Sequence, residues 1–326
     1  MSRPDVDGIG GQIHTLEARL EACDLCPRQC GVDRSRGELG FCQTGERVPV
    51  AHIGLHQGEE PPISGTRGSG TIFFAHCNLR CVFCQNHQIS QPVTPIGMDH
   101  FTPSELADEM VALQERGAHN VNLVSPTHVA AQVAAAIALA GQRGLSIPTV
   151  YNTNGYERIE TLQALDGLID VYLPDIKYSN DRMARRYSDA AGYAAVSRAA
   201  IGEMFRQVGN LVTDSEGLAV RGLLVRHLVL PADVAGSEAS LTFLASLSKA
   251  MVVSLMAQYA PQHKASEMPL LDRPITVDEY QRVIDLALSL GLTRCYVQET
   301  EASHELVPDF ERPRPFAGEE IGENVR

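Results

Sequence analysis

The chain has 326 residues, and 27 Lys and Arg against 40 Asp and Glu give it a formal net charge of −13. Nucleic acids and anionic membranes are bound through basic surfaces, so this balance excludes a general binder of either kind. Hydrophobic residues make up 44% of the chain, which is typical of a globular rather than a disordered protein. Residues 1–12 lack the apolar stretch of a signal peptide, and no apolar window is long enough to span a bilayer. We therefore expect a cytoplasmic protein.

From residue 71 onward, strand-like and helix-like segments alternate along the chain. Short β-branched or aromatic runs predict strands at 71–75, 120–124, 147–151, 170–173, 223–229, 251–255 and 294–298. Capping-box sequences predict helix starts at Thr102 and Thr276, and a further helix is expected at 129–140. This alternation predicts an α/β fold on a parallel sheet. Six or seven units favour a partial or full (β/α) TIM-like barrel over a doubly wound sheet.

The composition divides the chain into three regions. Residues 1–70 contain thiols, glycines and turn dipeptides but few periodic runs, and we interpret them as a Cys-rich N-terminal metal-binding subdomain. Residues 71–301 are expected to form the barrel core. Residues 302–326 are rich in Pro, Glu and Gly and are expected to form a C-terminal tail.

Seven of the eight cysteines fall into two sets within the first 84 residues. The first cysteine set is Cys23, Cys26, Cys30 and Cys42, and the second cysteine set is Cys77, Cys81 and Cys84. In a reducing compartment such sets indicate metal sites rather than disulfides. Three thiolates can hold three irons of a cubane cluster and leave the fourth open, whereas electron-transfer clusters use four cysteines. Zinc completed by His76 or His87 is the alternative for the second set.

The segment CNLRCVFC at 77–84 resembles the CxxxCxΦC signature of radical S-adenosylmethionine (SAM) enzymes, with Phe83 at the aromatic position Φ. The segments CPRQCGVDRSRGELGFC, HQGEEPPISG, LVSPTHV, VYLPDIKY and VRHLVLP resemble the branch related to pyruvate formate-lyase-activating enzyme (PflX-type), in the expected order. The resemblance implies a [4Fe–4S] cluster on the second cysteine set, with S-adenosyl-L-methionine on the open iron. Reduction of SAM would then give methionine and a 5′-deoxyadenosyl radical that abstracts hydrogen from a substrate.

The resemblance also implies SAM-binding residues where the predicted strands end. SPTH stands where related enzymes carry a GGE-type segment, while a TNG segment and a D-x-K element match theirs. The remaining candidates follow strands whose carboxyl ends face the same cleft. Ordinary turn chemistry is the alternative for each residue. The residues expected to bind SAM are Ser125, Thr127, Asn152, Thr153, Asn154, Asp175, Lys177, Arg226 and Gln258.

The first cysteine set is a complete group of four thiolates, which suits either structural zinc or an auxiliary iron–sulfur cluster. Zinc is slightly favoured, because metal binding supplies folding free energy to a small subdomain with little core. Between the two sets, His56, Glu59 and Glu60 suggest proton transfer or substrate binding, with a solvated turn as the alternative.

Three functions are compatible with the sequence. The first is an activating enzyme that abstracts hydrogen from a glycine of a glycyl radical enzyme, and the second is the same chemistry on a peptide or small molecule. The third is a non-catalytic module in which both cysteine sets bind zinc. The two enzymes would need a one-electron reductant of the flavodoxin or ferredoxin type. No nucleic-acid or membrane partner is expected.

Overall fold

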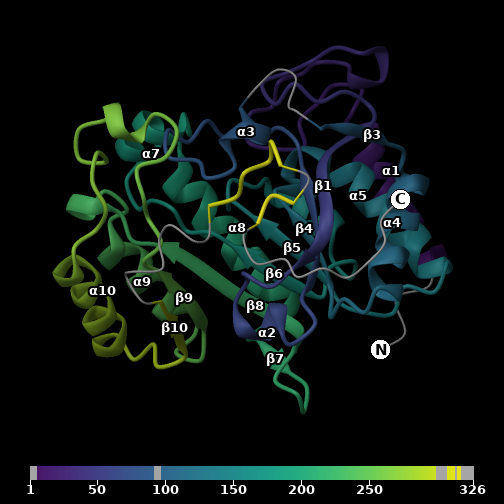
Figure 1. The fold of residues 1–326 in the computed structure, drawn as a ribbon. Coiled ribbons are helices and arrows are strands. Elements are labelled where there is room, and N and C mark those ends of the chain that lie inside the picture. Colours follow the sequence, from purple (N-terminus) through teal and green to yellow (C-terminus); the bar gives the residue numbers. More distant parts are fainter. Residues whose placement is uncertain (1–5, 92–96, 299–306, 313, 317–326) are drawn as a thin grey trace.

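The computed structural model of the chain describes residues 6–91, 97–298, 307–312 and 314–316. Its centre is a ten-stranded sheet with the order β10-β9-β8-β6-β5-β4-β2-β1-β3, and β7 pairs with β8 outside this path (Figure 1). The strands are β1 (Val48–His56), β2 (Ser69–Phe74), β3 (Asp99–Phe101), β4 (Val121–Val124), β5 (Thr149–Thr153), β6 (Val171–Pro174), β7 (Val212–Thr213), β8 (Ala219–Leu228), β9 (Val252–Met256) and β10 (Cys295–Val297).

Seven strands of this sheet are parallel and coincide with the seven predicted from the sequence: β2, β4, β5, β6, β8, β9 and β10. Most of them are buried along their whole length, which explains their continuous apolar runs. The described strands run from β10 at one end of the order to β3 at the other, so they form the partial rather than the closed barrel.

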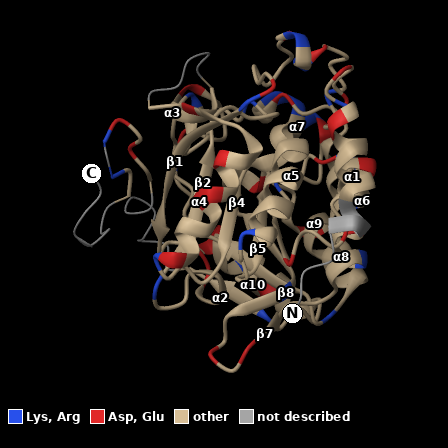
Figure 2. Cartoon of the chain, turned by 90° about the vertical axis from the view of Figure 1, so that its right-hand side faces the viewer, with Lys and Arg blue, Asp and Glu red and all other residues tan. Residues whose placement is uncertain are grey.

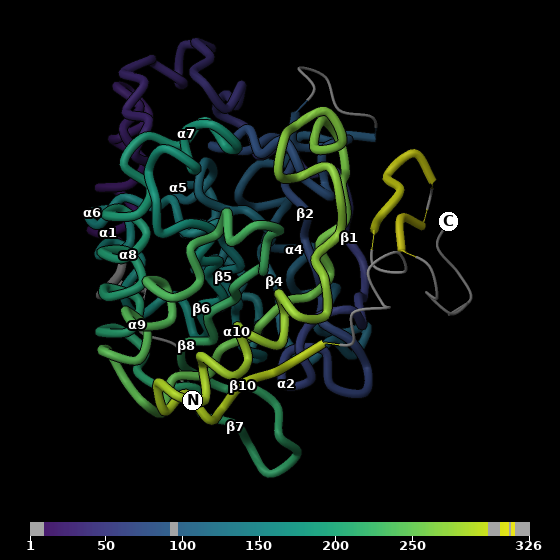
Figure 3. The backbone as a smooth tube through the Cα atoms, turned by 90° about the vertical axis from the view of Figure 1, so that its left-hand side faces the viewer, coloured from purple at the N-terminus to yellow at the C-terminus, as the bar shows by residue number. Residues whose placement is uncertain are grey.

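Helices cover the outer face of the sheet. Figure 3 shows α1, α6, α8 and α9 stacked along one side of the strands. The two capping boxes predicted at Thr102 and Thr276 are confirmed at the starts of α4 and α10. The helices are α1 (Val6–Ala18), α2 (Pro61–Ser64), α3 (His87–Ser90), α4 (Pro103–Glu115), α5 (Ala130–Gln142), α6 (Ile159–Ala164), α7 (Asp181–Ser188), α8 (Tyr193–Val208), α9 (Ser237–Leu247) and α10 (Val277–Ser289). Short 3-10 turns lie at η1 (Arg34–Arg36), η2 (Pro126–Val129), η3 (Pro231–Asp233) and η4 (Ala265–Glu267).

Two elements from the first 70 residues belong to the barrel. Strand β1 pairs antiparallel with β2, and α1 packs against α5 and α6. Neither was predicted from the sequence. The division of the chain at residues 70 and 301 stays a prediction, and residues 302–306, 313 and 317–326 of the expected tail lie outside the described residues.

The charge distribution agrees with the composition. Figure 2 shows acidic and basic residues interspersed over the outer helices and turns that it displays. In the described part of the chain, no helix combines the length and the apolar character needed to cross a membrane.

Candidate active site

A cavity of about 380 Å³ lies inside the barrel and brings together most of the predicted site residues. Its size is within the roughly 300–1,000 Å³ of small-molecule sites. It reaches from the second cysteine set to the segment after β1. Of the residues expected to contact a cofactor, its wall contains Cys77, Cys81, Cys84, Ser125, Asn152, Thr153, Asn154, Asp175, Lys177, Arg226 and Gln258.

The second cysteine set lies on the loop that follows β2, which we call the second cysteine loop (residues 75–84). Each thiol has a polar neighbour: the Leu79 amide donates to Cys77 Sγ at 3.4 Å, Ser188 Oγ donates to Cys81 Sγ at 2.9 Å, and Ser90 Oγ lies 3.3 Å from Cys84 Sγ. Burial raises the pKa of Cys77 and of Cys81 to about 11, so the free thiols keep their protons at neutral pH. A metal centre must displace these protons when it binds.

The loops after β5 and β6 are locked to one another beside the cysteines. Asn154 Nδ2 donates to Cys77 Sγ at 3.4 Å, and the Tyr193 hydroxyl donates to the Asn154 carbonyl at 2.8 Å. The same hydroxyl accepts from the Lys177 amide at 3.0 Å. Gly155 has φ +76°, and a Cβ there would meet the Asp175 carbonyl oxygen at 2.3 Å, so only glycine allows this approach. Tyr193 lies 16 residues beyond Lys177, and nothing in the sequence marked its role.

Asp175 and Lys177 form an ion pair at the cavity wall. Burial by itself lowers the pKa of Lys177, but the negative charges of the Asp175 carboxylate and of Cys81 in its thiolate form outweigh burial and raise it above its ordinary value. Lys177 therefore carries a positive charge beside Cys81. That charge favours the thiolate form that a metal centre requires.

At the other end of the cavity, Arg226 is held between two carboxylates. Its guanidinium pairs with Glu59 and bonds to both oxygens of Glu60, at 2.9 and 2.6 Å. The side chains of Glu59 and Glu60 are 8% exposed and that of Arg226 is 13% exposed. Burial raises the pKa of Glu60, but Arg226 overcomes this and holds it below its usual range. These three residues, which we call the floor cluster, rule out a solvated turn for Glu59 and Glu60.

One predicted contact is not supported by the geometry. Thr127 is fully buried and does not line the cavity, because its hydroxyl donates to Glu157 at 2.5 Å. Thr153, which does line the cavity, also donates to Glu157. Glu157 was not singled out from the sequence, although burial raises its pKa to about 7. Its carboxyl group therefore connects the turns after β4 and β5 from behind the cavity wall.

The donor set of the second cysteine loop fits a cubane cluster with one open iron. Three thiols from one loop face the cavity, and thiolates on three irons stand further apart than thiolates on one ion. Neither His76 nor His87, the proposed fourth zinc ligands, lines the cavity. In the described part of the chain, no three His, Cys, Asp or Glu side chains converge closely enough for a single metal ion. Such a site defines a class of enzyme that binds a small molecule at an iron–sulfur cluster.

Comparisons with known proteins identify that class. Residues 71–212 match the family model described as the radical SAM superfamily. The chain is 31% identical over 281 residues to "Uncharacterized protein MJ0674" of Methanocaldococcus jannaschii, covering 84% of this chain and 76% of that protein. It is 24% identical over 300 residues to "Uncharacterized protein MJ0808" of the same organism, covering 86% and 82%.

The fold agrees with this assignment. The solved structure of HydG, a maturase of the [FeFe]-hydrogenase, superposes with a TM-score of 0.50 at 10% identity, covering 93% of this chain and 59% of that one. The chain belongs to the radical SAM superfamily and is an enzyme of that superfamily, with a [4Fe–4S] cluster and SAM as its cofactors. When bound, these cofactors supply a 5′-deoxyadenosyl radical. The protein's residues hold the cofactors, orient the substrate and exclude water.

Proposed function

We propose that the enzyme binds its cluster through the second cysteine set and abstracts hydrogen from a small substrate inside the cavity. SAM and the reacting part of the substrate must share about 380 Å³. This is near the lower end of the range for small-molecule sites, so the reacting part of the substrate is small. In this proposal the strand-end residues Ser125, Asn152, Thr153, Asn154, Asp175, Lys177 and Gln258 contact SAM, and Arg226 belongs to the substrate end.

The floor cluster carries the proposal for the substrate. Two buried carboxylates share one guanidinium, which leaves one net negative charge in a cavity wall. An uncompensated buried charge is unfavourable, and a ligand that brings the opposite charge relieves it. Asn122 Nδ2 already donates to Glu59 at 2.8 Å, so Glu59 is oriented for a further donor. We therefore propose a substrate with a cationic group, such as a primary ammonium.

The test uses the full-length enzyme, reconstituted anaerobically with iron and sulfide and then reduced with SAM present. Release of 5′-deoxyadenosine is measured with a panel of primary amines and with the N-acetyl form of each. We expect the amines alone to stimulate release, and deuterium on the true substrate to appear in the nucleoside. Cys81→Ala should abolish release, and Glu59→Gln should raise KM for the amine more than it lowers kcat. Equal stimulation by the neutral N-acetyl forms would contradict a cationic substrate.

Activation of a glycyl radical enzyme is the second candidate. It is supported by the activating-enzyme-like TNG and D-x-K segments, which both line the cavity, and by the small size of a glycine residue. A protein loop would have to reach the cavity beside Phe316, whose ring centroid lies 4.1 Å from that of His56. Incubation with a protein carrying a C-terminal glycine loop should then give a glycyl radical signal in electron paramagnetic resonance (EPR).

Both candidates require one electron for each SAM cleaved, and we propose a flavodoxin- or ferredoxin-type protein as its donor. A cytoplasmic location, as expected from the sequence, would keep the thiols reduced.

A further inference from the structure

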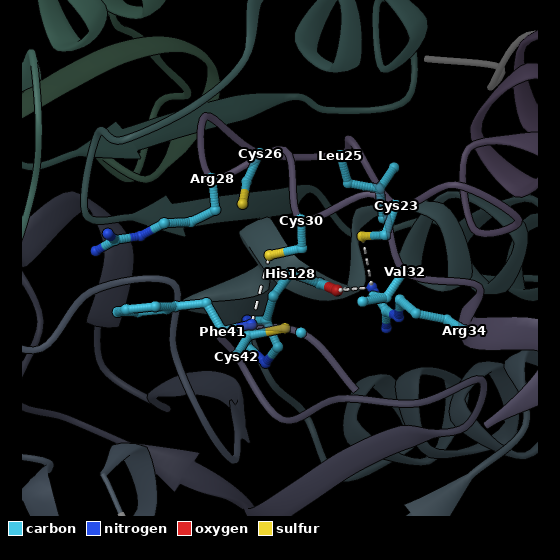
Figure 4. A pocket seen from close by; sticks show the side chains of 11 residues that line it. Cys23, Leu25, Cys26, Arg28, Cys30, Val32, Arg34, Phe41, Cys42 and His128 are labelled. Carbon is cyan, nitrogen blue, oxygen red and sulfur yellow. Dashed lines mark hydrogen bonds between the residues drawn. The ribbon is translucent and has the colours of Figure 1, made fainter. Parts of the chain in front are cut away.

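The first cysteine set surrounds a small cavity of its own. Cys23, Cys26, Cys30 and Cys42 line a space of about 10 Å³, and Figure 4 shows their sulfur atoms facing it from different sides. Residues 19–47, which carry these thiols, form no helix or strand apart from η1. Backbone hydrogen bonds from the Cys23 amide to Val32 and from Gly31 to Cys23 nevertheless hold the loop in one shape. A segment with so little apolar core is of the kind that bound metal stabilises.

Arg34 supplies a charge argument for a ligand at this cavity. It is 1% exposed and lines the space, with Nη1 3.9 Å from Cys23 Sγ. Its other hydrogen bonds go to the carbonyls of Gly45 and His128, and no carboxylate pairs with it in the described part of the chain. Burying a cation costs least when it is paired with a negative charge as well as hydrogen-bonded, and the described acceptors of Arg34, apart from Cys23 Sγ, are carbonyls. Protonated thiols supply no negative charge, whereas metal-bound thiolates do.

His128 gives an independent observation. His128 lines the same cavity and is 2% exposed. Nε2 bonds to the Ala75 carbonyl at 2.8 Å, so it carries the ring hydrogen and leaves Nδ1 as an acceptor. Nδ1 is buried and has no hydrogen-bond partner among the described residues. A residue that lines the same space as the four thiols therefore carries a buried acceptor that no described residue satisfies.

A bridge of arginine and aromatic side chains connects this cavity to the second cysteine loop. The Phe41 amide donates to Cys30 Sγ at 3.4 Å, and the Phe41 ring lies between Arg28 and Arg80, whose Cζ atoms are 3.7 and 4.5 Å from its centroid. Arg80 donates to the Phe41 carbonyl at 2.7 Å and to the Cys77 carbonyl at 2.8 Å. Arg28 Nε donates to the Asn78 carbonyl at 2.9 Å. A group that holds Cys30 and Phe41 in place therefore also holds the backbone of Cys77 and Asn78 in place, through the hydrogen bonds of Arg80 and Arg28.

We propose that the first cysteine set binds a thiolate-held metal centre, which fixes the second cysteine loop through Phe41. Zinc and an iron–sulfur cluster share this thiolate chemistry. Because no three thiols of the described residues converge closely enough for a single ion, the geometry favours the cluster, whose thiolates are spread over several irons, and metal analysis distinguishes the two. The proposal is independent of the substrate, so it stands or fails separately from the proposed function.

The first test counts metal in the full-length protein after anaerobic reconstitution with iron and sulfide. Besides the roughly four irons of the second set, we expect either one zinc or about four further irons. Cys26→Ser should lose this additional metal and keep the other irons, whereas Cys81→Ser should do the reverse. Cys295→Ser, which removes the one cysteine outside both sets, should match the wild type. A wild-type count of four irons without zinc would overturn the proposal, as would an unchanged count in Cys26→Ser.

The second test addresses the anchoring role, and it remains informative if Cys26→Ser does not fold. Phe41→Leu removes the ring between the two arginines and leaves all seven ligating thiols in place. We expect it to retain the wild-type metal count but to alter the SAM-dependent change in the EPR spectrum of the reduced protein. Cys295→Ser should leave that change as in the wild type. A wild-type spectrum in Phe41→Leu would overturn the anchoring role.

Discussion

Replacing Arg226 with methionine tests the floor cluster most directly. Methionine keeps much of the side-chain length but leaves Glu59 and Glu60 as neighbouring carboxylates that are each 8% exposed. Removing one partner of a buried ion pair destabilises a protein by about 3–5 kcal/mol. We expect the free energy of unfolding of Arg226→Met to be lower than that of the wild type by this amount at pH 8. Arg143→Met is the matched control, because Arg143 pairs with Asp108 at the surface and its loss should be below about 1 kcal/mol.

The pH dependence of this loss has a definite sign. In the wild type, the pKa of Glu60 is held below its unfolded value, so Glu60 stabilises the fold above that value and this stability disappears as pH falls. Without Arg226, burial raises the pKa of Glu60, and stability is instead lost as pH rises. The difference between the two proteins should therefore increase from pH 5 to pH 8.

Urea unfolding of both variants followed by far-ultraviolet circular dichroism measures this difference, since the chain contains no tryptophan for fluorescence. A loss in Arg226→Met no larger than that in Arg143→Met, or a loss equal at both pH values, would refute the reasoning.

Three further predictions concern the loops around the site. Burial raises the pKa of Glu157 to about 7, so this residue destabilises the fold as pH rises from about 4.5 to 7, by up to about 3 kcal/mol. In urea titrations, the free energy of unfolding of Glu157→Gln should not decline over this pH range. Parallel pH profiles of the variant and the wild type would contradict the prediction. Gly155→Ala would place a Cβ 2.3 Å from the Asp175 carbonyl oxygen, so the SAM dissociation constant should rise, and an unchanged constant counts against this packing. Tyr193→Phe leaves the Lys177 amide without its acceptor and should cost about 1–3 kcal/mol in the same titrations, and an unchanged free energy of unfolding would contradict this.

The parallel strands could be predicted because burial on both faces imposes short apolar runs on the sequence. Strand β1 could not, since its residues are only partly buried and its place is set by pairing with β2 in an otherwise thiol- and glycine-rich region. Helix α8 lacked the usual start signal. The helix begins after Gly192, whose backbone is in the left-handed region, and no side chain caps its first turn.

The site likewise combines features that the sequence predicts with features that it does not. The gathering of the second cysteine set and most strand-end candidates around one cavity was predictable, because in a parallel sheet the ends of all strands meet at one rim. Thr127 follows β4 as expected, but it turns toward Glu157, and a rule about strand ends does not specify side-chain direction. The pairing of Glu60 with Arg226 joins residues 166 positions apart, and no local pattern in the sequence encodes it.

That separation also sets the order in which the enzyme becomes complete during its synthesis. At about 5–20 residues per second, the ribosome makes Arg226 roughly 8–33 s after Glu60. Throughout this interval the nascent chain carries both carboxylates without their cation, and the second cysteine set is made early in it, because Cys77 to Cys84 follow Glu60 closely in the chain. The end of the cavity that the floor cluster builds therefore cannot form before most of the sheet exists. A chain that ends before Arg226 would retain the second cysteine set but lack the ion pairs of the floor cluster.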